Sequence, residues 1–397
     1  MARPIRLGVA GLGRAFTLML ATLSAHPSVK LVAAADPRAE ARERFAADFG
    51  ATAYESVEAL CDDASVEAVY VATPHELHAR HAALAAARGK HVLVEKPMAV
   101  TLAEAQSMID AARAAGVHLV VGHSHSFDAP ILRARAIVES GELGRVRMIT
   151  AMNFTDFLYR PRRAEELDTT AGGGVVFSQA AHQVDIVRLL AGGLARSVRA
   201  FTGAWDASRA TEGAYSALLA FEDAAFASIS YSGYGHFDSD ELCGNIGETG
   251  FPKDASRHGA ARRALAALDG AGAEAAAKAK RNYGGAGYAK AGDAPWHEHF
   301  GFVIVSCERG DVRPMPAGVM VYGDESVRVE PLAKPAVPRA EVIDELVAAV
   351  RGGAAPMHDG AWGLATLEVC IAMLASARES REVALTRQCR PHGMIRA

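Results

Sequence analysis

The sequence predicts an α/β fold, in which an N-terminal doubly wound parallel sheet is followed by an α+β domain with a mostly antiparallel open sheet. Three observations favour this fold. Short apolar runs alternate with single helical stretches in the first third of the chain, several apolar runs follow one another later, and 397 residues are enough for two or three domains. Parallel strands need crossover connections, which alternating helices supply.

The first domain is predicted over residues 1–127. Its expected strands are short apolar runs, and its expected helices have apolar residues at helical spacing. In chain order we expect strand 5–10, helix 15–25, strand 31–35, helix 38–49, strand 68–72, helix 75–88, strand 91–94, helix 101–115 and strand 117–122. Gly116 ends the last of these helices.

The second domain is predicted over residues 128–397. We expect helices at 129–140, 174–190, 339–351 and 361–380, and strands at 146–154, 198–204, 215–221 and 225–231. Residues 247–295 are rich in Ala, Lys, Arg and Gly, and their helical middle, 255–281, lacks a long apolar face. We interpret this stretch as a surface insertion that serves as a lid or an oligomer contact.

Composition excludes several classes of partner. Lys plus Arg total 42 and Asp plus Glu total 46, so the net charge of −4 does not attract nucleic acid or an anionic membrane. The five cysteines are scattered without a C-x-x-C pair, which is typical of free thiols in a reducing cytoplasm. No signal peptide and no membrane-spanning run is recognised, so the protein is expected in the cytoplasm.

A glycine turn directly after the first strand indicates a dinucleotide site. Gly11, Leu12 and Gly13 open the first helix at Arg14, where glycines let a pyrophosphate approach backbone N–H groups. Phe16 replaces the third glycine of the usual pattern. Asp36 ends the second strand, where its carboxylate can accept from ribose hydroxyls and repel a 2′-phosphate, which favours NAD over NADP. Arg38 weakens that preference because it could reach a phosphate or stack on adenine.

Two further segments fall at carboxyl ends of predicted strands, where doubly wound proteins bind ligands. They are the segment 72–78, ATPHELH, and the segment 89–97, GKHVLVEKP. These two segments and the glycine turn are accompanied by a later run, Gly172-Gly173-Gly174, which is followed by His182 and Asp185. Together these motifs resemble those of the Gfo/Idh/MocA family of nicotinamide-dependent oxidoreductases. The resemblance implies a Rossmann domain that binds NAD through the first turn and through Thr73, Pro74, His75, His78, Glu95 and Lys96.

The resemblance also implies the catalytic residues. A cation such as Lys96 stabilises a developing alkoxide during hydride transfer and can relay its proton. In the family the Lys–Pro bond is often cis, which would fix the direction of the ammonium group. His182 is the best candidate for proton acceptor or donor. Ser178 stands where the sugar and inositol dehydrogenases of the family carry an aspartate, and helical spacing places it on one face with His182 and Asp185.

Three arginines suggest an anionic substrate. Arg160, Arg162 and Arg163 lie in a loop that the family directs towards the pocket, and a guanidinium matches a carboxylate. With the segment 306–314, they look similar to the phthalate cis-4,5-dihydrodiol dehydrogenase branch of the family. The substrate would then be a cis-dihydrodiol with two carboxylates, oxidised towards a catechol. Its binding residues would be these arginines together with His123, His125, Ser178 and Asp185.

Several alternatives stay open at this point. His123 and His125, and likewise His297 and His299, form H-x-H pairs that could hold a metal, but the family's hydride transfer needs none, so a metal-free site is expected. A sugar or inositol dehydrogenase, a non-catalytic NAD-binding regulator and an NAD-dependent glycosidase are the competing functions. An open sheet with an uncovered face also predicts a homodimer or homotetramer.

Overall fold

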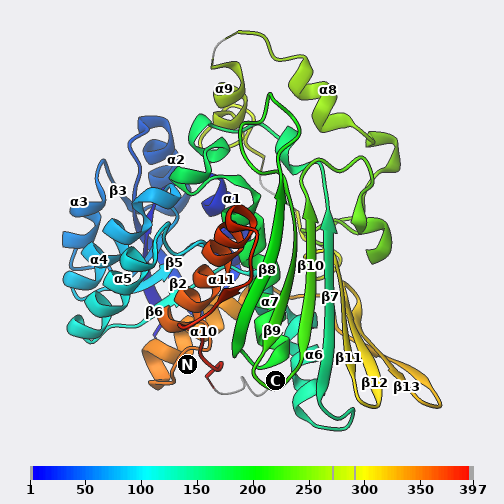
Figure 1. The fold of residues 1–397 in the computed structure, drawn as a ribbon. Helices are drawn as coiled ribbons and strands as arrows, with labels where there is room; N and C mark the ends of the chain where they lie inside the picture. Colours follow the sequence, from blue (N-terminus) through cyan, green and yellow to red (C-terminus); the bar gives the residue numbers. More distant parts are fainter. Residues whose placement is uncertain (1–2, 271, 290–291, 393–397) are drawn as a thin grey trace.

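The computed structural model describes residues 3–270, 272–289 and 292–392, and it contains two sheets (Figure 1). The first sheet is parallel, with the strand order β3-β2-β1-β4-β5-β6. This order reverses direction between β1 and β4, which is where doubly wound sheets bind ligands. Its strands are β1 (Ile5–Ala10), β2 (Val29–Ala35), β3 (Thr52–Tyr54), β4 (Ala68–Val71), β5 (His91–Val94) and β6 (Leu119–Val121).

The helices of the first domain follow the predicted alternation closely. They are α1 (Arg14–Ala25), α2 (Ala39–Phe49), α3 (Val57–Asp62), α4 (His78–Ala87) and α5 (Leu102–Ala115). Helix α5 begins at a capping box, in which Thr101 and Glu104 exchange bonds with each other's backbone, and it ends at Gly116 with φ of 64°. The short elements β3 and α3 were not predicted, because they have three and six residues and little apolar pattern.

The second sheet has nine strands in the order β14-β13-β12-β11-β7-β10-β9-β8-β15. All neighbours are antiparallel except β7 and β10. The predicted strands correspond to β7 (Val146–Phe154), β8 (Ala195–Gly203), β9 (Ala214–Phe221) and β10 (Phe226–Ser232). Five further strands were not predicted from the sequence: β11 (Phe302–Cys307), β12 (Gly310–Met315), β13 (Gly318–Gly323), β14 (Val327–Pro331) and β15 (Val383–Ala384).

Helices cover one face of this sheet and leave the other exposed. α6 (Ala129–Glu139), α7 (Ala181–Ala191) and α11 (Gly360–Glu379) contribute to the same apolar core as the inward side chains of the strands. A π-helical turn, Val176–Ala180, precedes α7 within the predicted helix 174–190. The exposed face carries six large apolar side chains between 37% and 64% exposed: Met148, Phe201, Leu218, Phe226, Val327 and Val329.

The C-terminal helices connect the two halves of the molecule. Val342, Ile343 and Leu346 of α10 (Ala340–Gly352) belong to the core that contains Ile5 and Leu7 of β1. By length and composition alone, α11 is long and apolar enough to cross a membrane. However, 72% of its most apolar 18-residue stretch is buried inside the structure. Such burial is what a core helix between two sheets requires.

The insertion forms two short helices rather than the one predicted over 255–281. α8 (Ala260–Ala266) and α9 (Ala273–Ala279) lie together at the top of Figure 1. After α9 the chain returns to the first domain, where Tyr283 is fully buried. Its ring meets Phe16 edge-on with centroids 5.1 Å apart, and its hydroxyl donates to Asp48 at 2.6 Å. The insertion is therefore anchored beside α1 and α2.

Candidate active site

The turn between β1 and α1 fits a phosphate group. Gly11 has φ of 93°, and a Cβ there would lie 2.8 Å from the carbonyl oxygen of Ala72, so only glycine suits this position. Gly13 caps α1 without a side-chain hydrogen bond, and no atom lies within 4 Å of where its Cβ would be. The first N–H groups of α1 are thus available to an anion. Arg14 is exposed at the start of the helix and donates to Thr17.

Asp36 stands at the end of β2 and is bonded to this turn. Its carboxylate accepts from the backbone N–H of Leu12 at 2.8 Å and from the backbone N–H of Arg38 at 2.9 Å. The guanidinium of Arg38 bonds the same carboxylate, the carbonyl of Leu12 and the carbonyl of Tyr283. Arg38 is therefore held by protein groups, so its capacity to receive a 2′-phosphate is reduced, which agrees with the preference for NAD.

The loop after β4 presents its backbone rather than its side chains. The hydroxyl of Thr73 is paired with the Nδ1 of His81 at 3.0 Å, and Pro74 begins the next helical turn. The ring of His78 is fully buried between the carbonyl oxygens of Pro97 and Thr73, both at 2.8 Å. Burial lowers the pKa of His78 to about 4, whereas the two carbonyl oxygens favour the protonated ring, because a neutral imidazole can donate to only one of them.

Half-buried His75 and buried Glu95 lie near Lys96. His75 places Nδ1 3.0 Å from the carbonyl oxygen of Gly172, and burial lowers its pKa to about 3. Glu95 accepts from the hydroxyl of Tyr70 at 2.5 Å, and burial raises the pKa of this carboxyl group. The carboxylate of Glu95 lies within electrostatic range of Lys96 and supports its charged form, although burial dominates and lowers the pKa of Lys96.

Lys96 joins the first domain to the segment before α7. Its Nζ donates to the carbonyl oxygen of Ser178 at 2.9 Å, and the Lys96–Pro97 bond is cis, as the resemblance implies. The hydroxyl of Ser178 donates to the carbonyl of Gly174 within its own helical turn. Ser178 therefore meets Lys96 through its backbone, and its side chain is engaged elsewhere.

His182 lies at the centre of a buried group of rings. The residue is 6% exposed. Its ring centroid lies 4.7 Å from that of His125 and 4.8 Å from that of Phe300. Burial, followed by the charge of Lys96, holds the pKa of His182 well below its ordinary value. Its Nδ1 accepts from the backbone N–H of His125 at 3.4 Å, which leaves the proton of the neutral ring on Nε2.

His123 and His125 both turn towards Asp128. The Nε2 of His123 lies 3.3 Å, and the Nδ1 of His125 2.7 Å, from a carboxylate oxygen of Asp128. Burial disfavours a charged ring, yet Asp128 and Glu248 together raise the pKa of His125 to about 9. These contacts engage the histidines with carboxylates of the protein.

Glu248 is a site residue that the sequence analysis missed, because it lies in the stretch interpreted as a surface insertion. Its carboxylate is 3.4 Å from the Nε2 of His125 and within electrostatic range of Arg160. Phe300, just after the insertion, stacks on Tyr231 with ring planes 10° apart. Both aromatic residues are almost fully buried, so they form an apolar wall beside His182.

The three predicted arginines differ in their partners. Arg162 places its guanidinium 3.5 Å above the ring of Phe157 and donates to the carbonyl of the same residue at 2.8 Å. Within the described residues no carboxylate lies within ion-pair distance of its side chain. Arg162 lies within electrostatic range of Lys96, and the carboxylate of Glu166 is the strongest charge that acts on its own guanidinium.

The other two arginines are paired. Arg160 binds Asp156 at 3.1 Å, and Arg163 binds Glu165 at 3.1 Å and Glu166 at 3.6 Å. A paired guanidinium must share or release its carboxylate before it can bind a substrate anion. Arg162 is therefore the strongest of the three candidates.

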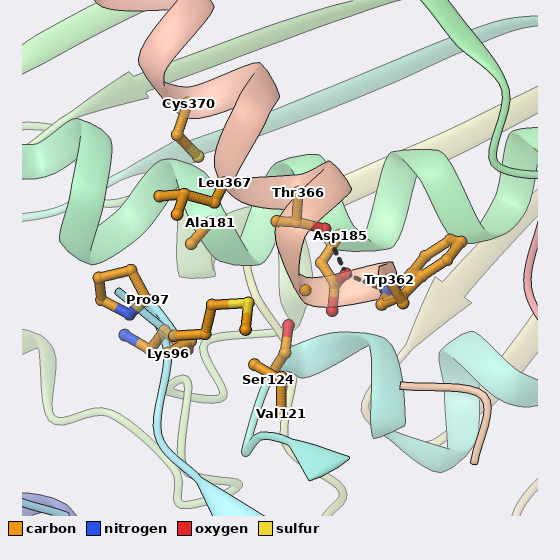
Figure 2. A pocket seen from close by; sticks show the side chains of 12 residues that line it. Lys96, Pro97, Val121, Ser124, Ala181, Asp185, Trp362, Thr366, Leu367 and Cys370 are labelled. Carbon is orange, nitrogen blue, oxygen red and sulfur yellow. Dashed lines mark hydrogen bonds between the residues drawn. The ribbon is translucent and has the colours of Figure 1, made fainter. Parts of the chain in front are cut away.

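The structure directs Asp185 away from the ring cluster. Its carboxylate accepts from Trp362 at 2.5 Å, from Thr366 at 2.9 Å and from Ser126 at 2.5 Å. Figure 2 shows it turned towards α11, in a small and mostly apolar cavity that has Lys96 on its other side. The shared helix face predicted for Asp185 and His182 did not reveal this, because the donors come from α11 and from Ser126. Asp185 supports α7 and α11 against each other.

Comparison with known proteins agrees with this arrangement. Residues 5–123 match the model of the oxidoreductase family with an NAD-binding Rossmann fold, and residues 131–250 match the GFO/IDH/MocA C-terminal domain. A 1-carboxy-3-chloro-3,4-dihydroxycyclohexa-1,5-diene dehydrogenase from Comamonas testosteroni is 48% identical over 378 residues, which cover 94% of this chain and 95% of the relative.

Solved structures give the same result. A dehydrogenase from Bordetella bronchiseptica RB50 is 43% identical, with a TM-score of 0.90 over 96% of this chain and 100% of that one. The WlbA dehydrogenase from Bordetella pertussis, solved with NADH and UDP-GlcNAcA, shares the fold at 23% identity, with a TM-score of 0.68 over 97% and 99% of the two chains. The chain belongs to the Gfo/Idh/MocA family of NAD-binding oxidoreductases, which act on CH–OH groups.

Proposed function

We propose that the protein is an NAD-dependent dehydrogenase that oxidises an aromatic cis-dihydrodiol bearing a ring carboxylate to the corresponding catechol. Phthalate cis-4,5-dihydrodiol, with two carboxylates, is the substrate that the arginine loop favours. The observation that carries this proposal is the guanidinium of Arg162, which has no carboxylate partner among the described residues and lies in electrostatic range of Lys96. The relative from Comamonas testosteroni, named for a carboxylated diene diol, supports the same substrate class.

The chain provides the groups that such a reaction needs. The turn at Gly11 and Gly13, the free N–H groups of α1 and the carboxylate of Asp36 would hold NAD, which when bound accepts the hydride from the carbinol carbon. Lys96 can take the hydroxyl proton of the substrate, since burial lowers the pKa of its amine and so makes loss of the ammonium proton easier. The N–H at Nε2 of His182 donates to the same oxygen and stabilises its developing charge.

The product completes the reaction without a further protein group. Loss of hydride and of one hydroxyl proton gives a ring ketone conjugated with a double bond. Loss of the proton on the neighbouring carbon, with reprotonation of the oxygen, converts this ketone into the catechol. The sum is diol plus NAD giving catechol, NADH and one proton. The buried rings of Phe300 and Tyr231 keep the surroundings of His182 apolar, while Arg162 binds the carboxylate of the substrate.

Absorbance of NADH tests the proposal directly. The purified full-length protein is mixed with NAD and, separately, with phthalate cis-4,5-dihydrodiol, a monocarboxylated cis-dihydrodiol, a neutral cis-dihydrodiol, myo-inositol and glucose. Turnover of the carboxylated diols at the highest kcat/KM is the expected result. Preferential turnover of inositol or glucose would transfer the protein to the sugar dehydrogenases of the family.

The proposal includes the assembly and the compartment. Six large apolar side chains on the open face of the nine-stranded sheet favour a homodimer formed through that face, or a tetramer that contains this contact. All five cysteines are free thiols, of which Cys61, Cys243 and Cys370 are buried. Free thiols and an NAD-dependent reaction favour the reducing cytoplasm.

A further inference from the structure

A group of four potential metal ligands lies beside the ring of His182. His123, His125, Asp128 and Glu298 each offer one ligand atom, and these atoms lie within 4.8 Å of one another. The two histidines and Asp128 come from the loop that follows β6, whereas Glu298 comes from the chain that returns from the insertion. All four side chains are at least 87% buried.

We propose that His123, His125, Asp128 and Glu298 form a binding site for one divalent transition-metal ion, with zinc as the best match. Zinc is bound in proteins by imidazole nitrogens and carboxylate oxygens, and four such ligands suit its tetrahedral geometry. With metal–ligand distances of about 2.0–2.2 Å, neighbouring ligand atoms in a tetrahedron lie about 3.3 Å apart. The Nε2 of His123 lies 3.3 Å from Asp128 and 4.0 Å from Glu298, so small side-chain rotations complete the geometry.

The residues behind the ligands orient them as metal sites require. Glu248 lies 3.4 Å from the Nε2 of His125, on the side of the ring opposite to Asp128. A carboxylate in this position fixes the imidazole with Nδ1 directed to the ion. Arg339 donates to Glu298 at 2.8 Å and so holds that carboxylate in place.

The charge balance also favours a dication. With neutral imidazoles, Arg339 pairs with Glu298 and Arg160 lies within electrostatic range of Glu248, whereas the carboxylate of Asp128 contacts only the two imidazoles among the ion pairs of the described residues. Glu341 of α10 adds a further carboxyl group at the edge of the cluster, where a cavity lined by Asp128, Glu298 and Glu341 gives an ion a path inwards. Four protein ligands leave no open position, so the ion holds the wall of the pocket together rather than binding substrate.

The site differs from the one that the H-x-H pairs suggest. From the sequence, both pairs were possible ligands and a metal-free protein was expected. The structure brings only the first pair into the cluster. His297 turns its Nε2 to the carbonyl of Ala333 at 2.8 Å and His299 to that of Ile246 at 2.9 Å. The ligand from the second pair is the residue between its histidines, Glu298.

The test uses the full-length protein and the metal alone. The protein is treated with a chelator and desalted, then titrated with zinc by calorimetry and with cobalt by visible absorbance. We expect one zinc ion per chain, and cobalt bands of four-coordinate intensity that zinc abolishes. Asp128→Asn and Glu298→Gln should lose stoichiometric binding, whereas His258→Ala, at an exposed histidine outside the cluster, should keep it.

The design separates this site from folding and from other sites. Glu248→Gln leaves all four ligands in place and should weaken zinc binding about 10- to 100-fold, which a folding defect would not reproduce. Circular dichroism checks that each variant keeps its fold. Absence of stoichiometric zinc and of cobalt bands in the wild-type protein would overturn the proposal, and the cluster would then be an ion-pair network with a charged His125. Unchanged binding in the Asp128→Asn and Glu298→Gln variants would overturn it as well. Neither result depends on the identity of the substrate.

Discussion

Replacement of Arg162 by alanine is the sharpest test of substrate recognition. The guanidinium is already positioned, because it stacks 3.5 Å above Phe157 and donates to the carbonyl of that residue. Its remaining N–H groups have no carboxylate partner among the described residues. A hydrogen bond to a charged group contributes about 1.5–3 kcal/mol, and about 1.4 kcal/mol corresponds to a tenfold change. The KM of a carboxylated diol should therefore rise about 10- to 150-fold.

Steady-state rates with the carboxylated and the neutral cis-dihydrodiol measure this effect. Only the carboxylated substrate should lose affinity in Arg162→Ala, and the kcat of both should change little, since the carboxylate lies away from the reacting carbon. Arg162→Lys keeps the charge without the planar fork and should give an intermediate KM. Arg163→Ala is the matched control, because its guanidinium is already paired with Glu165 and Glu166. Equal increases in KM for the charged and neutral diols would refute the assignment of Arg162.

Three further predictions concern catalysis, the insertion and the assembly. Lys96→Met should lower kcat about 10²- to 10⁴-fold, whereas NAD binding, measured by fluorescence quenching, should stay within a few-fold of wild type. Equal losses in kcat and in NAD affinity would contradict a proton-transfer role. Tyr283→Ala removes a fully buried ring that packs on Phe16, so the free energy of unfolding measured in urea titrations should fall by about 3 kcal/mol. A loss below about 1 kcal/mol would show that Tyr283 does not anchor the insertion. Leu218→Lys, on the exposed sheet face, should convert the oligomer to a monomer in light scattering, whereas Ala207→Lys in a loop should not.

Local patterns account for the parts of the fold that were predicted from sequence. Helix α5 was located almost to the residue, because Thr101, Glu104 and Gly116 act through bonds within a few residues of each other. The strands β11 to β14 were missed, because the apolar alternation in residues 302–331 is short and broken by turns. β11 pairs with the distant β7, and β12, β13 and β14 follow it as consecutive hairpins, so the position of the whole group depends on a contact that local sequence does not show.

The residues of the candidate site show the same contrast between local motifs, which could be predicted, and long-range contacts, which could not. Lys96 and His182 were found through motifs that fix residue type and spacing, and the structure brings Lys96 to the backbone of Ser178, one helical turn before His182. The direction in which Asp185 turns could not be predicted, because its donors Trp362 and Thr366 lie on a helix almost 180 residues later in the chain. Side-chain orientation depends on contacts that only the complete fold defines.

The insertion links the two halves of the site more closely than its composition indicates. Near its start, Glu248 contacts His125, and just after its end, Glu298 contacts Arg339 and lies 4.0 Å from His123. Between them, Tyr283 packs beside the dinucleotide turn, where its carbonyl accepts from the arginine that pairs with Asp36. One segment thus contacts both the predicted cofactor residues and the predicted substrate residues. A substitution that loosens Tyr283 should therefore change the KM for the diol as well as the KM for NAD, although Tyr283 belongs to the core of the first domain.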